Sequence, residues 1–575
     1  MRTLLLLIGL LAACGPKDTP PEKTFSIRLE PAVLNLRVTE TGNVKVIVSR
    51  SGGFSEAVMV TLGGENTGLT ADPLSIPAAS SEGTLSFRVS DAAKIGTSFP
   101  VVQAKSGAIS KSETLTLRVA KAVAEATKIT VKDNAGSVQV RQGFGNVTLE
   151  VEGKNLERVT AFKLGDLEVS ALPGRTSNQL ELGVKVPHGA NPGAKALVLT
   201  AAGGDTTFPA ALFITPITSG PAGNDSTGAG TTDKPYRTMK KALSLSQPGD
   251  TVRLLNGTYT ASSGETWPAF GTNVTPNVPP AVKVEGESRD GAVLEGPGTT
   301  SKTVGLAFSD DSGAKTLTVR GFAAGLFVGS GNVTLESVLA SGNAVGFGVN
   351  GGSIKASEAE FKGNKTGILL TGMAILEVSG GSSHDNSDRG VVVGGKALKL
   401  QAKDFEVFGN TTGLFAAGGA EVRLEGVKIH DNRDHGLKAS EQATLSLTAS
   451  ELYENARAGL WFSGKRLVAR GTTIRDNKEF GLYVEGSPDK VDFGSFTEPG
   501  NNDLHTNGPN GTGDQILDVR SDRATLGDPE SFTLSATRLN GVTPAADIYP
   551  GDGKWPYLNA PYFSILGTNN LIRVY

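Results

Sequence analysis

The carboxyl half of the chain repeats an Asn at intervals of 21 to 24 residues. A Gly follows each Asn after three or four residues, and an apolar residue comes directly after that Gly. A fixed period of this length, filled with short strand-like segments and no helical pattern, predicts a β-solenoid in which each repeat forms one coil. The Asn residues are Asn343, Asn364, Asn386, Asn410, Asn432, Asn455 and Asn477, and the Gly residues are Gly346, Gly367, Gly390, Gly413, Gly436, Gly459 and Gly481.

Each repeat contains three segments in which apolar and polar residues alternate, for example 422–424, 427–429 and 437–439. Alternation with a period of two predicts strands with one buried face, and three strands per repeat predict triangular coils stacked about 4.8 Å apart. We expect two continuous interior columns. The first comprises Leu335, Ala356, Val378, Leu400, Leu424, Leu447 and Ala469, and the second comprises Ala340, Phe361, Ser383, Val407, Ile429, Leu452 and Ile474.

The repeated Asn and Gly residues have a structural explanation. Asn tolerates the left-handed turn conformation, and its amide can both donate to and accept from the Asn of the next coil. Gly reaches positive φ without steric cost, so we interpret the Gly column as a turn requirement. The repeat therefore favours a structural amide ladder over a row of polar ligands.

The amino terminus predicts export. A cationic start is followed by the apolar run 4–11 and by small residues, which is typical of a secretory signal covering 1–13. The stretch Leu11-Ala12-Ala13-Cys14 resembles the lipobox of bacterial lipoproteins, which implies lipid attachment to Cys14, the only Cys in the chain. Residues 14–23 would be a tether. We therefore expect a protein anchored to the cell envelope, at the outer membrane or cell surface, with the membrane as a partner.

Two β-sandwiches are expected before the solenoid. The range 24–120 contains short alternating runs separated by turn clusters and resembles bacterial Ig-like modules. The range 126–216 is similar in size, and its segment 147–156 resembles the opening of the IPT/TIG group of Ig-like folds. Modules of these groups in exported proteins are usually spacers or glycan-contacting units. The net charge of −3 and the lack of basic runs predict no nucleic-acid partner.

The range 217–232 is rich in Gly, Ser and Thr and is expected to be a linker. A short helix should follow, with Asp233 as its N-cap and Pro235 in its first turn. This helix would cap a β-helix domain spanning 233–527, because an open coil exposes core and unpaired strand edges. Residues 528–575 are expected to be a C-terminal cap or tail.

Several motifs carry a family resemblance. In order along the chain they are Gly223-Asn224-Asp225, Lys234-Pro235-Tyr236-Arg237-Thr238, Pro248-Gly249-Asp250-Thr251-Val252, Gly257-Thr258-Tyr259 and Val491-Asp492-Phe493-Gly494. They resemble an uncharacterised bacterial subgroup of the pectin-lyase-like right-handed parallel β-helix proteins. The resemblance implies an all-β chain that ends in a right-handed parallel β-helix. It does not select an activity, because the superfamily contains lyases, hydrolases, epimerases and non-enzymes.

One turn region gathers charged side chains directly before and after the Asn residues. Acids at successive Asn−1 positions would stack about 5 Å apart, which needs a counter-charge or a cation such as Ca²⁺, although no metal site is assigned. The candidate catalytic residues are Asp431, Glu454, Arg457, Arg475 and Asp476. The candidate ligand-binding residues are His384, Asp385, His430, Asp434 and His435. A solvated structural rim would explain the same residues.

Three functions remain open. The leading hypothesis is a non-catalytic envelope lipoprotein whose β-helix binds polysaccharide or another envelope component. The alternative is a polysaccharide lyase or glycoside hydrolase acting on acidic glycans, because lyases of this superfamily use an Arg or Lys base with acid-bound Ca²⁺ and its inverting hydrolases use paired Asp residues. The third is an architectural subunit of a surface layer.

Overall fold

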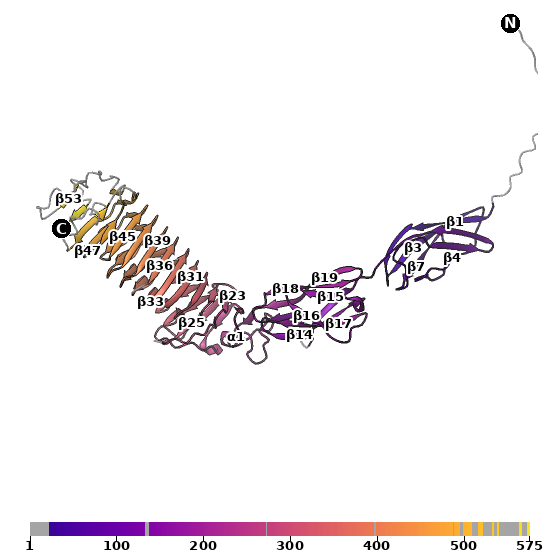
Figure 1. Ribbon diagram of the computed structural model, residues 1–575, viewed down its shortest axis with the longest axis horizontal. Coiled ribbons are helices and arrows are strands. Elements are labelled where there is room, and N and C mark those ends of the chain that lie inside the picture. Colours follow the sequence, from indigo (N-terminus) through magenta and orange to yellow (C-terminus); the bar gives the residue numbers. More distant parts are fainter. Residues whose placement is uncertain are drawn as a thin grey trace, which may run out of the picture. The chain divides into compact units, whose positions relative to one another are not determined.

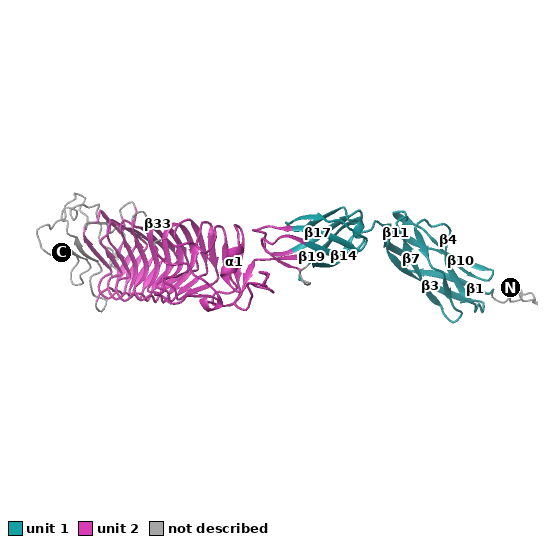
Figure 2. Cartoon of the chain, turned by 90° about the horizontal axis from the view of Figure 1, so that it is seen from below, with its two compact units in different colours: residues 1–137, 148–184, 195–211 teal, residues 138–147, 185–194, 212–575 magenta. Residues whose placement is uncertain are grey.

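The computed structural model describes residues 22–132, 137–271, 273–395, 398–486, 488–494 and 498–508, and the short segments 516–520, 532–533, 537–539, 563–565 and 572–574 (Figure 1). The chain divides into two compact units (Figure 2). The expected architecture is confirmed. Over the described residues the chain is mostly β, with N-terminal sandwich domains followed by a parallel β-solenoid of about nine turns and one short α-helix.

The first sandwich contains three sheets. Their strand orders are β1-β3-β7-β5, β10-β9-β4-β6 and β2-β11-β8. Alternate residues of β1 and β3 are buried, as expected for strands with one face on a core. The strands are β1 (Thr24–Glu30), β2 (Val33–Arg37), β3 (Thr41–Ser51), β4 (Val58–Gly63), β5 (Leu69–Ala71), β6 (Leu74–Ile76), β7 (Glu82–Val89), β8 (Gly96–Ser98), β9 (Val101–Ser106), β10 (Ile109–Thr114) and β11 (Thr116–Ala120).

The second sandwich contains two four-stranded sheets, ordered β12-β14-β17-β16 and β13-β19-β18-β15. A short 3-10 helix, η1 (Leu156–Arg158), follows β14. The strands are β12 (Glu125–Val131), β13 (Gln139–Arg141), β14 (Gly145–Lys154), β15 (Ala161–Leu164), β16 (Glu168–Ala171), β17 (Gln179–Val186), β18 (Gly193–Ala201) and β19 (Gly204–Thr215).

The solenoid has three faces. Two of them belong to one 23-stranded sheet that bends around the coils, and the third is a 12-stranded sheet. Strands β31 (Val345–Ser357) and β33 (Thr366–Ser379) each run through the bend and contribute to two faces. All pairings between successive coils over residues 217–505 are parallel, as expected for a solenoid whose consecutive coils lie directly on one another.

One face consists of β25 (Val304–Phe308), β28 (Ala324–Val328), β31, β33, β35 (Arg389–Gly394), β38 (Thr412–Ala417), β41 (Leu437–Ala439), β44 (Leu460–Phe462) and β47 (Leu482–Gly486). The next consists of β20 (Ile217–Ser219), β21 (Thr251–Leu254), β23 (Lys283–Gly286), β26 (Ser312–Lys315), β29 (Asn332–Glu336), β36 (Lys399–Lys403), β39 (Glu421–Glu425), β42 (Thr444–Thr448), β45 (Arg466–Arg470) and β48 (Lys490–Asp492), together with the second halves of β31 and β33.

The 12-stranded face consists of β22 (Gly257–Tyr259), β24 (Ala292–Glu295), β27 (Thr318–Arg320), β30 (Leu339–Ser341), β32 (Glu360–Lys362), β34 (Ser382–His384), β37 (Glu406–Phe408), β40 (Lys428–His430), β43 (Glu451–Tyr453), β46 (Thr473–Arg475), β49 (Asp503–His505) and β52 (Arg538–Leu539). The remaining strands of the 23-stranded sheet are β50 (Ile516–Arg520), β51 (Phe532–Thr533), β53 (Phe563–Ile565) and β54 (Ile572–Val574).

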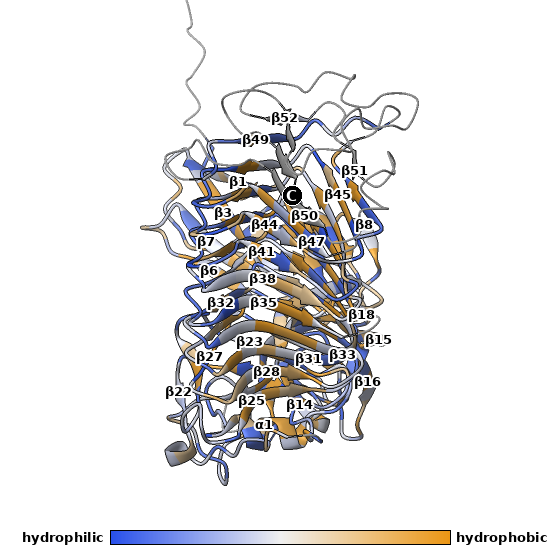
Figure 3. Ribbon diagram, turned by 90° about the vertical axis from the view of Figure 1, so that its left-hand side faces the viewer, coloured by the Kyte–Doolittle hydropathy of each residue, from blue (hydrophilic) through white to orange (hydrophobic). Residues whose placement is uncertain are grey.

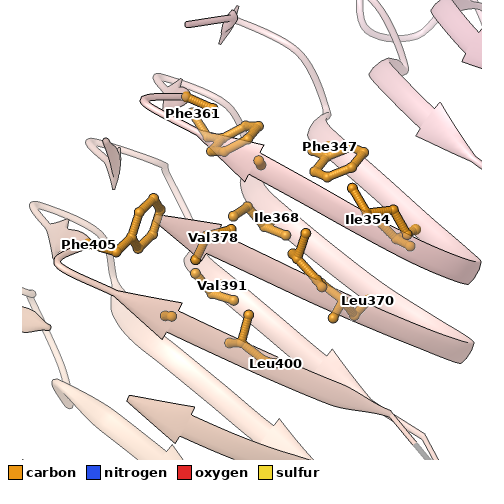
Figure 4. Packing of buried hydrophobic residues seen from close by; sticks show 14 of the residues in the cluster. Phe347, Ile354, Phe361, Ile368, Leu370, Val378, Val391, Leu400 and Phe405 are labelled. Atoms are coloured by element: carbon orange, nitrogen blue, oxygen red, sulfur yellow. The ribbon is translucent and has the colours of Figure 1, made fainter. Parts of the chain in front are cut away.

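The core is continuous through the coils. Hydrophobic stretches recur along the stacked strands (Figure 3), and residues such as Phe347, Ile368 and Val391 project between them into the interior (Figure 4). The second interior column is confirmed in register from Ala340 to Ile474. Because no single coil encloses this core, each coil depends on its neighbours for burial.

The first interior column needs one correction. Val378 pairs with Ala402, whereas Leu400 pairs with Leu376 on one side and Val422 on the other. Both Leu400 and Ala402 are buried, since the strand presents two inward positions to the core. The sequence pattern identified the inward face but not which of its two rows Leu400 occupies.

The capping helix begins later than expected. Helix α1 (Met239–Leu245) has Thr238 as its N-cap, whose side chain accepts from the backbone N–H of Lys241 at 3.0 Å. Asp233 therefore lies outside the helix. Asp225 and Glu265 accept hydrogen bonds from the other backbone N–H groups at this end. The helix contacts β20 and β21, the first strands of the solenoid, so β20 belongs to the β-helix although residues 217–219 were expected to be linker.

Several expectations lie outside the described residues. They are the signal peptide 1–13, Cys14, nearly all of the tether 14–23, and most of the segment 528–575. Among the residues that are described, no helix has the length and apolar content needed to cross a bilayer.

Candidate functional site

The Asn residues form one continuous buried ladder. From Asn364 onward, the side-chain Oδ1 of each Asn accepts hydrogen bonds from both the backbone N–H and the Nδ2 of the Asn in the preceding coil, for example from Asn386 N at 3.0 Å and Asn386 Nδ2 at 2.9 Å to Asn410. Each Nδ2 also donates to a backbone carbonyl, which for Asn410 belongs to Ser383. All members are at most 2% exposed. The ladder extends to Asn507, whose separation of 30 residues from Asn477 hid it from the repeat pattern.

The Gly column has a different cause from the expected one. The Gly residues at 346, 367, 390, 413, 436 and 459 do not have positive φ. A Cβ at Gly436 would lie 2.6 Å from Asn455 Nδ2, and one at Gly413 would lie 2.4 Å from Gly436 O and 2.8 Å from Asn432 Nδ2. These Gly residues therefore leave space for the amide ladder of the next coil and for its backbone.

The left-handed residue of each turn precedes the Asn. It is Gly342, Gly363, Asp385, Gly409, Asp431, Glu454, Asp476 or Thr506, with φ between 53° and 66°. The Asn itself is not the residue in this conformation, which corrects the expectation for that position. Asp adopts the left-handed region more readily than most residues, and Gly does so without cost. We call Asp385, Asp431, Glu454 and Asp476 the acidic column, and backbone conformation explains much of its composition.

Side chains on the outside of the 12-stranded face form a second column, which we call the ring stack: His384, Phe408, His430, Tyr453 and Arg475. The ring centroids of His384 and Phe408 lie 4.5 Å apart, those of Phe408 and His430 lie 5.1 Å apart, and those of His430 and Tyr453 lie 4.6 Å apart. All three pairs are within 6° of parallel. The guanidinium of Arg475 continues the stack, 4.2 Å from the ring centroid of Tyr453.

The ring stack supplies partners for the acidic column. His384 Nδ1 lies 2.8 Å from Asp385 Oδ2, and the equivalent contact from His430 to Asp431 is also 2.8 Å. Arg475 donates to Asp476 Oδ2 at 2.8 Å, and its interaction with this carboxylate raises the pKa of Arg475. Burial opposes ionisation of Asp476, but hydrogen bonds from Thr506 and Arg475 outweigh it and lower the pKa of that carboxyl.

These contacts limit the chemistry of the catalytic candidates. Asp431 and Asp476 are each paired with a neighbouring side chain, while Glu454 is exposed in its turn. His384 and His430 are separated by Phe408, so they do not converge on one ligand. Within the part of the chain that the structure describes, no group of three or more His, Cys, Asp or Glu side chains is placed to hold a metal ion.

The other candidates lie on a different face, the one that contains β35, β38, β41, β44 and β47. His435 is 5% exposed, and its ring stacks on that of Trp461 at 5.3 Å. Its Nδ1 accepts from the backbone N–H of Ala458 at 3.3 Å. Arg457 lies between Asp434, at 3.6 Å, and Glu479, at 3.1 Å. The structure therefore divides the predicted residues between two faces and does not bring them into one site.

Burial controls the protonation of His435. Desolvation lowers its pKa to about 4, with an opposing effect from Asp434 and a further lowering by Arg457 and Lys438. Burial also lowers the pKa of Lys438, whose Nζ lies 3.0 Å from the ring centroid of Trp461. His435 is consequently a neutral acceptor near pH 7, which suits a structural contact.

The face that carries His435 also presents a continuous outward row, which we call the outer row. Its residues pair one to one between successive coils. They alternate with the fully buried core residues, so they point outward. The row comprises Phe327, Gly348, Leu369, Val392, Phe415, Lys438, Trp461 and Tyr483.

The outer row combines aromatic rings with cations. Phe415, Trp461 and Tyr483 are half-buried, and Arg389 lies 4.6 Å from the ring centroid of Phe415. The rings of Trp461 and Tyr483 are 6.2 Å apart and tilted by 48°, so they do not form a closed stack. Phe415 lies one coil beyond Val392 and was not singled out from the sequence, because alternation alone does not separate an outward Phe from a core residue.

The remaining face carries charge pairs between coils. Lys355 and Glu377 lie 3.8 Å apart, and Lys403 and Glu425 lie 2.8 Å apart. Further pairs join Lys315 to Glu336 and Lys399 to Glu421. Such exposed pairs contribute little individually, but they leave this face polar and internally matched.

Residues 221–514 match the model of a family described as protein of unknown function (DUF1565), and this match covers just over half of the 575 residues. The chain belongs to this family. The DUF1565 segment begins near β20 and contains the cap helix, the Asn ladder, the ring stack and the outer row. No curated protein matches the chain.

The solved structures that resemble the chain have low sequence identity and low structural similarity to it. The catalytic domain of a GH87 α-1,3-glucanase in complex with tetrasaccharides is 10% identical, over 87% of this chain and 92% of that one, with a TM-score of 0.35. An endo-fucoidan hydrolase from glycoside hydrolase family 107 is 12% identical over 35% of this chain, with a TM-score of 0.18, and the match spans 29% of its length. A three-Ig segment of titin is 13% identical, over 34% of this chain and 66% of that one, with a TM-score of 0.18.

Proposed function

We propose that this member of the DUF1565 family is an exported lipoprotein whose β-helix binds a polysaccharide along the outer row without cleaving it. The observation that carries the proposal is the sequence of half-buried Phe415, Lys438, Trp461 and Tyr483 at one outward position of four successive coils. Partly exposed aromatic side chains on an otherwise regular face mark an interaction surface.

The geometry of the outer row favours a linear ligand. Successive positions repeat with the strand spacing of about 4.8 Å, so an extended polymer can contact several coils at once. The rings offer apolar surface together with polar groups, the indole N–H of Trp461 and the hydroxyl of Tyr483. A folded protein partner would more commonly meet a broader patch, because specific protein interfaces bury about 800 Å² per partner.

The absence of cleavage is proposed from how the candidates are engaged. Arg457 contacts two carboxylates, and Arg475 contacts Asp476 and stacks on Tyr453. A general base must be able to reach a substrate proton, which these contacts oppose. The pectin-lyase-like kinship expected from the motifs is compatible with either outcome, since that superfamily includes non-enzymes.

Lipid attachment at Cys14 would hold the protein at the envelope, with the Ig-like modules as spacers. The motivation is the lipobox-like sequence before the only Cys of the chain. Expression of the wild type and of Cys14→Ser in a Gram-negative host tests this. The wild type should fractionate with membranes and the variant with the soluble periplasm. Equal fractionation of both would remove the anchor from the proposal.

The binding function is tested with purified protein on a panel of insoluble and soluble neutral and uronate polysaccharides. Retention of the wild type on at least one polysaccharide, and its loss in Trp461→Ala, is expected. Phe408→Ala, which changes the ring stack on another face, is the matched control and should be retained. If Phe408→Ala abolishes retention and Trp461→Ala does not, the outer row is the wrong surface.

The same panel distinguishes the enzymatic alternative. A lyase releases unsaturated products that absorb in the ultraviolet, and a hydrolase releases new reducing ends. Either signal, if lost in Asp431→Ala or Arg475→Ala, would replace the binding proposal with catalysis at the acidic column.

A further inference from the structure

A loop closes one end of the outer row. Residues 265–271 and 273–280, which we call the roof loop, lie beside the first coils between η2 (Ala261–Ser263) and β23. Glu265, the first residue of this loop, is 3% exposed and accepts hydrogen bonds from the backbone N–H groups of Met239 and Lys240 at 2.6 and 3.1 Å. The loop is thereby tied to the cap helix.

Two further contacts fix the roof loop over the solenoid face. The ring of Phe270 meets that of Phe327 edge-on, with centroids 6.0 Å apart. The side chain of Asn277 donates from Nδ2 to Gly305 O at 3.1 Å and accepts through Oδ1 from Ala307 N at 2.8 Å. Phe327 is the first member of the outer row, so the roof loop covers the place where that row begins.

A cavity of about 300 Å³ lies at this point. Val274 and Pro276 of the roof loop form one wall, and Phe327 forms part of another. The remaining lining comes from Ala307 to Asp310 and from Gly329 and Ser330. This volume is at the lower end of the range for small-molecule sites, and the lining combines apolar with polar residues.

The polar groups of the cavity favour a neutral polyhydroxyl ligand. Asp310 is its only charged lining residue, and Asp310 Oδ1 is oriented by hydrogen bonds from Asn332 N at 2.7 Å and Asn332 Nδ2 at 3.2 Å. A carboxylate accepts hydrogen bonds from hydroxyl groups and repels a uronate. The hydroxyls of Ser309 and Ser330 add donors and acceptors.

The charges along the outer row also favour a neutral ligand. Arg389, Lys438 and Arg457 are three cations at this face, and each lies near carboxylates from the set Asp388, Asp434, Glu479 and Glu485. The positive charge of these three side chains is therefore locally balanced, which weakens the attraction of a polyanion to the row.

We propose that the cavity under the roof loop holds the terminal sugar of a neutral polysaccharide whose following residues lie along the outer row. This inference rests on the proposed function, since it assigns a ligand class and a direction to the same surface. The roof loop blocks passage of the chain beyond Phe327, so the protein recognises chain ends and not chain interiors.

The test uses the full-length protein and fragments of whichever neutral polysaccharide it retains, in a series of doubling length. Calorimetry gives the association constant per chain. End recognition predicts a constant value once the fragment is longer than the outer row, because each chain has one terminal sugar of the required kind. Interior recognition predicts a value that rises with each doubling, because the number of binding registers rises.

Two variants connect this result to the cavity. Ser330→Trp fills it from an exposed turn and should weaken binding about tenfold or more, equivalent to roughly 1.4 kcal/mol. Asp310→Asn preserves an acceptor for Asn332, removes the charge, and should weaken binding without changing the length dependence. Ser379→Trp, exposed on another face, is the control for an added indole and should bind as the wild type does.

The outcomes separate the two proposals. An association constant that grows with length, or wild-type affinity in both Ser330→Trp and Asp310→Asn, overturns the chain-end inference while leaving a Trp461-dependent binding function intact. Retention only on uronate polysaccharides also overturns it. If the wild type retains none of the polysaccharides, the proposed function itself fails.

Discussion

The Nδ2 atom of Asn432 lies 2.8 Å from the position that a Cβ on Gly413 would occupy. The two residues belong to successive coils, and the close approach lets the Asn432 amide contact Asn410 on one side and Asn455 on the other. The recurrence of Gly in every repeat is therefore a consequence of the ladder in the neighbouring repeat.

Gly413→Ala should destabilise the solenoid although its backbone conformation is open to alanine. The added Cβ would meet Gly436 O at 2.4 Å, and the strain should cost roughly 1–3 kcal/mol of unfolding free energy. Gly394→Ala is the control, because a Cβ there meets no atom within 4 Å and its φ is not positive. Denaturant unfolding of both variants checks this, and equal stabilities would refute the steric explanation.

Asn410→Ala should interrupt the ladder. The substitution leaves the backbone N–H of Asn386 without its acceptor in a fully buried position and removes one acceptor of Asn386 Nδ2. An orphaned buried group costs roughly 1–3 kcal/mol, and the hydrogen bonds donated by Asn410 Nδ2 are lost as well, so the unfolding free energy should fall by several kcal/mol. Asn350→Ala, at an exposed site, should change it by less than about 0.5 kcal/mol. A similar small loss in both variants would mean that the ladder contributes little.

His435 should make stability depend on pH. Because burial lowers its pKa to about 4 in the fold, the unfolded chain binds a proton first as pH falls from about 6.5. Stability is therefore fully present near pH 7 and is lost progressively down to about pH 4, by at most roughly 3 kcal/mol. His435→Gln retains an acceptor for Ala458 N and does not titrate. Its unfolding free energy should fall less over that interval, and parallel profiles for the two proteins would contradict the assignment.

Phe408→Ala should weaken the 12-stranded face without affecting ligand binding. The ring lies between His384 and His430, and its loss removes two stacking contacts worth roughly 0.5–1.5 kcal/mol each in addition to buried area. Phe408→Tyr keeps the stack and should restore stability. Thermal unfolding provides the measurement. Loss of polysaccharide retention in Phe408→Ala with unchanged stability would instead show that the stack is a binding site.

The repeat in the sequence was sufficient to predict the solenoid. Period-two alternation identified its inward faces, and the second interior column follows in register from Ala340 to Ile474. Within that column, buried Ser383 is satisfied by donating to Gly390 O at 2.8 Å, a contact between two segments of one coil that the column pattern does not contain. The Asn ladder could be predicted from the sequence because each buried Asn side chain bonds to the Asn of the next coil, so an Asn recurs in every repeat.

What the sequence alone determined is thus whatever repeats with the coil: the architecture, the amide ladder and the inward residues, since each coil imposes the same local requirements on its neighbours. Only the tertiary structure decided the rest. It placed His435 and His430 on different faces of the solenoid. It also placed Phe408 between His384 and His430, and Phe327 beneath the roof loop. The outward positions of a solenoid carry no constraint from the core, so their surroundings depend on which loop folds over them and on which residues the next coil presents.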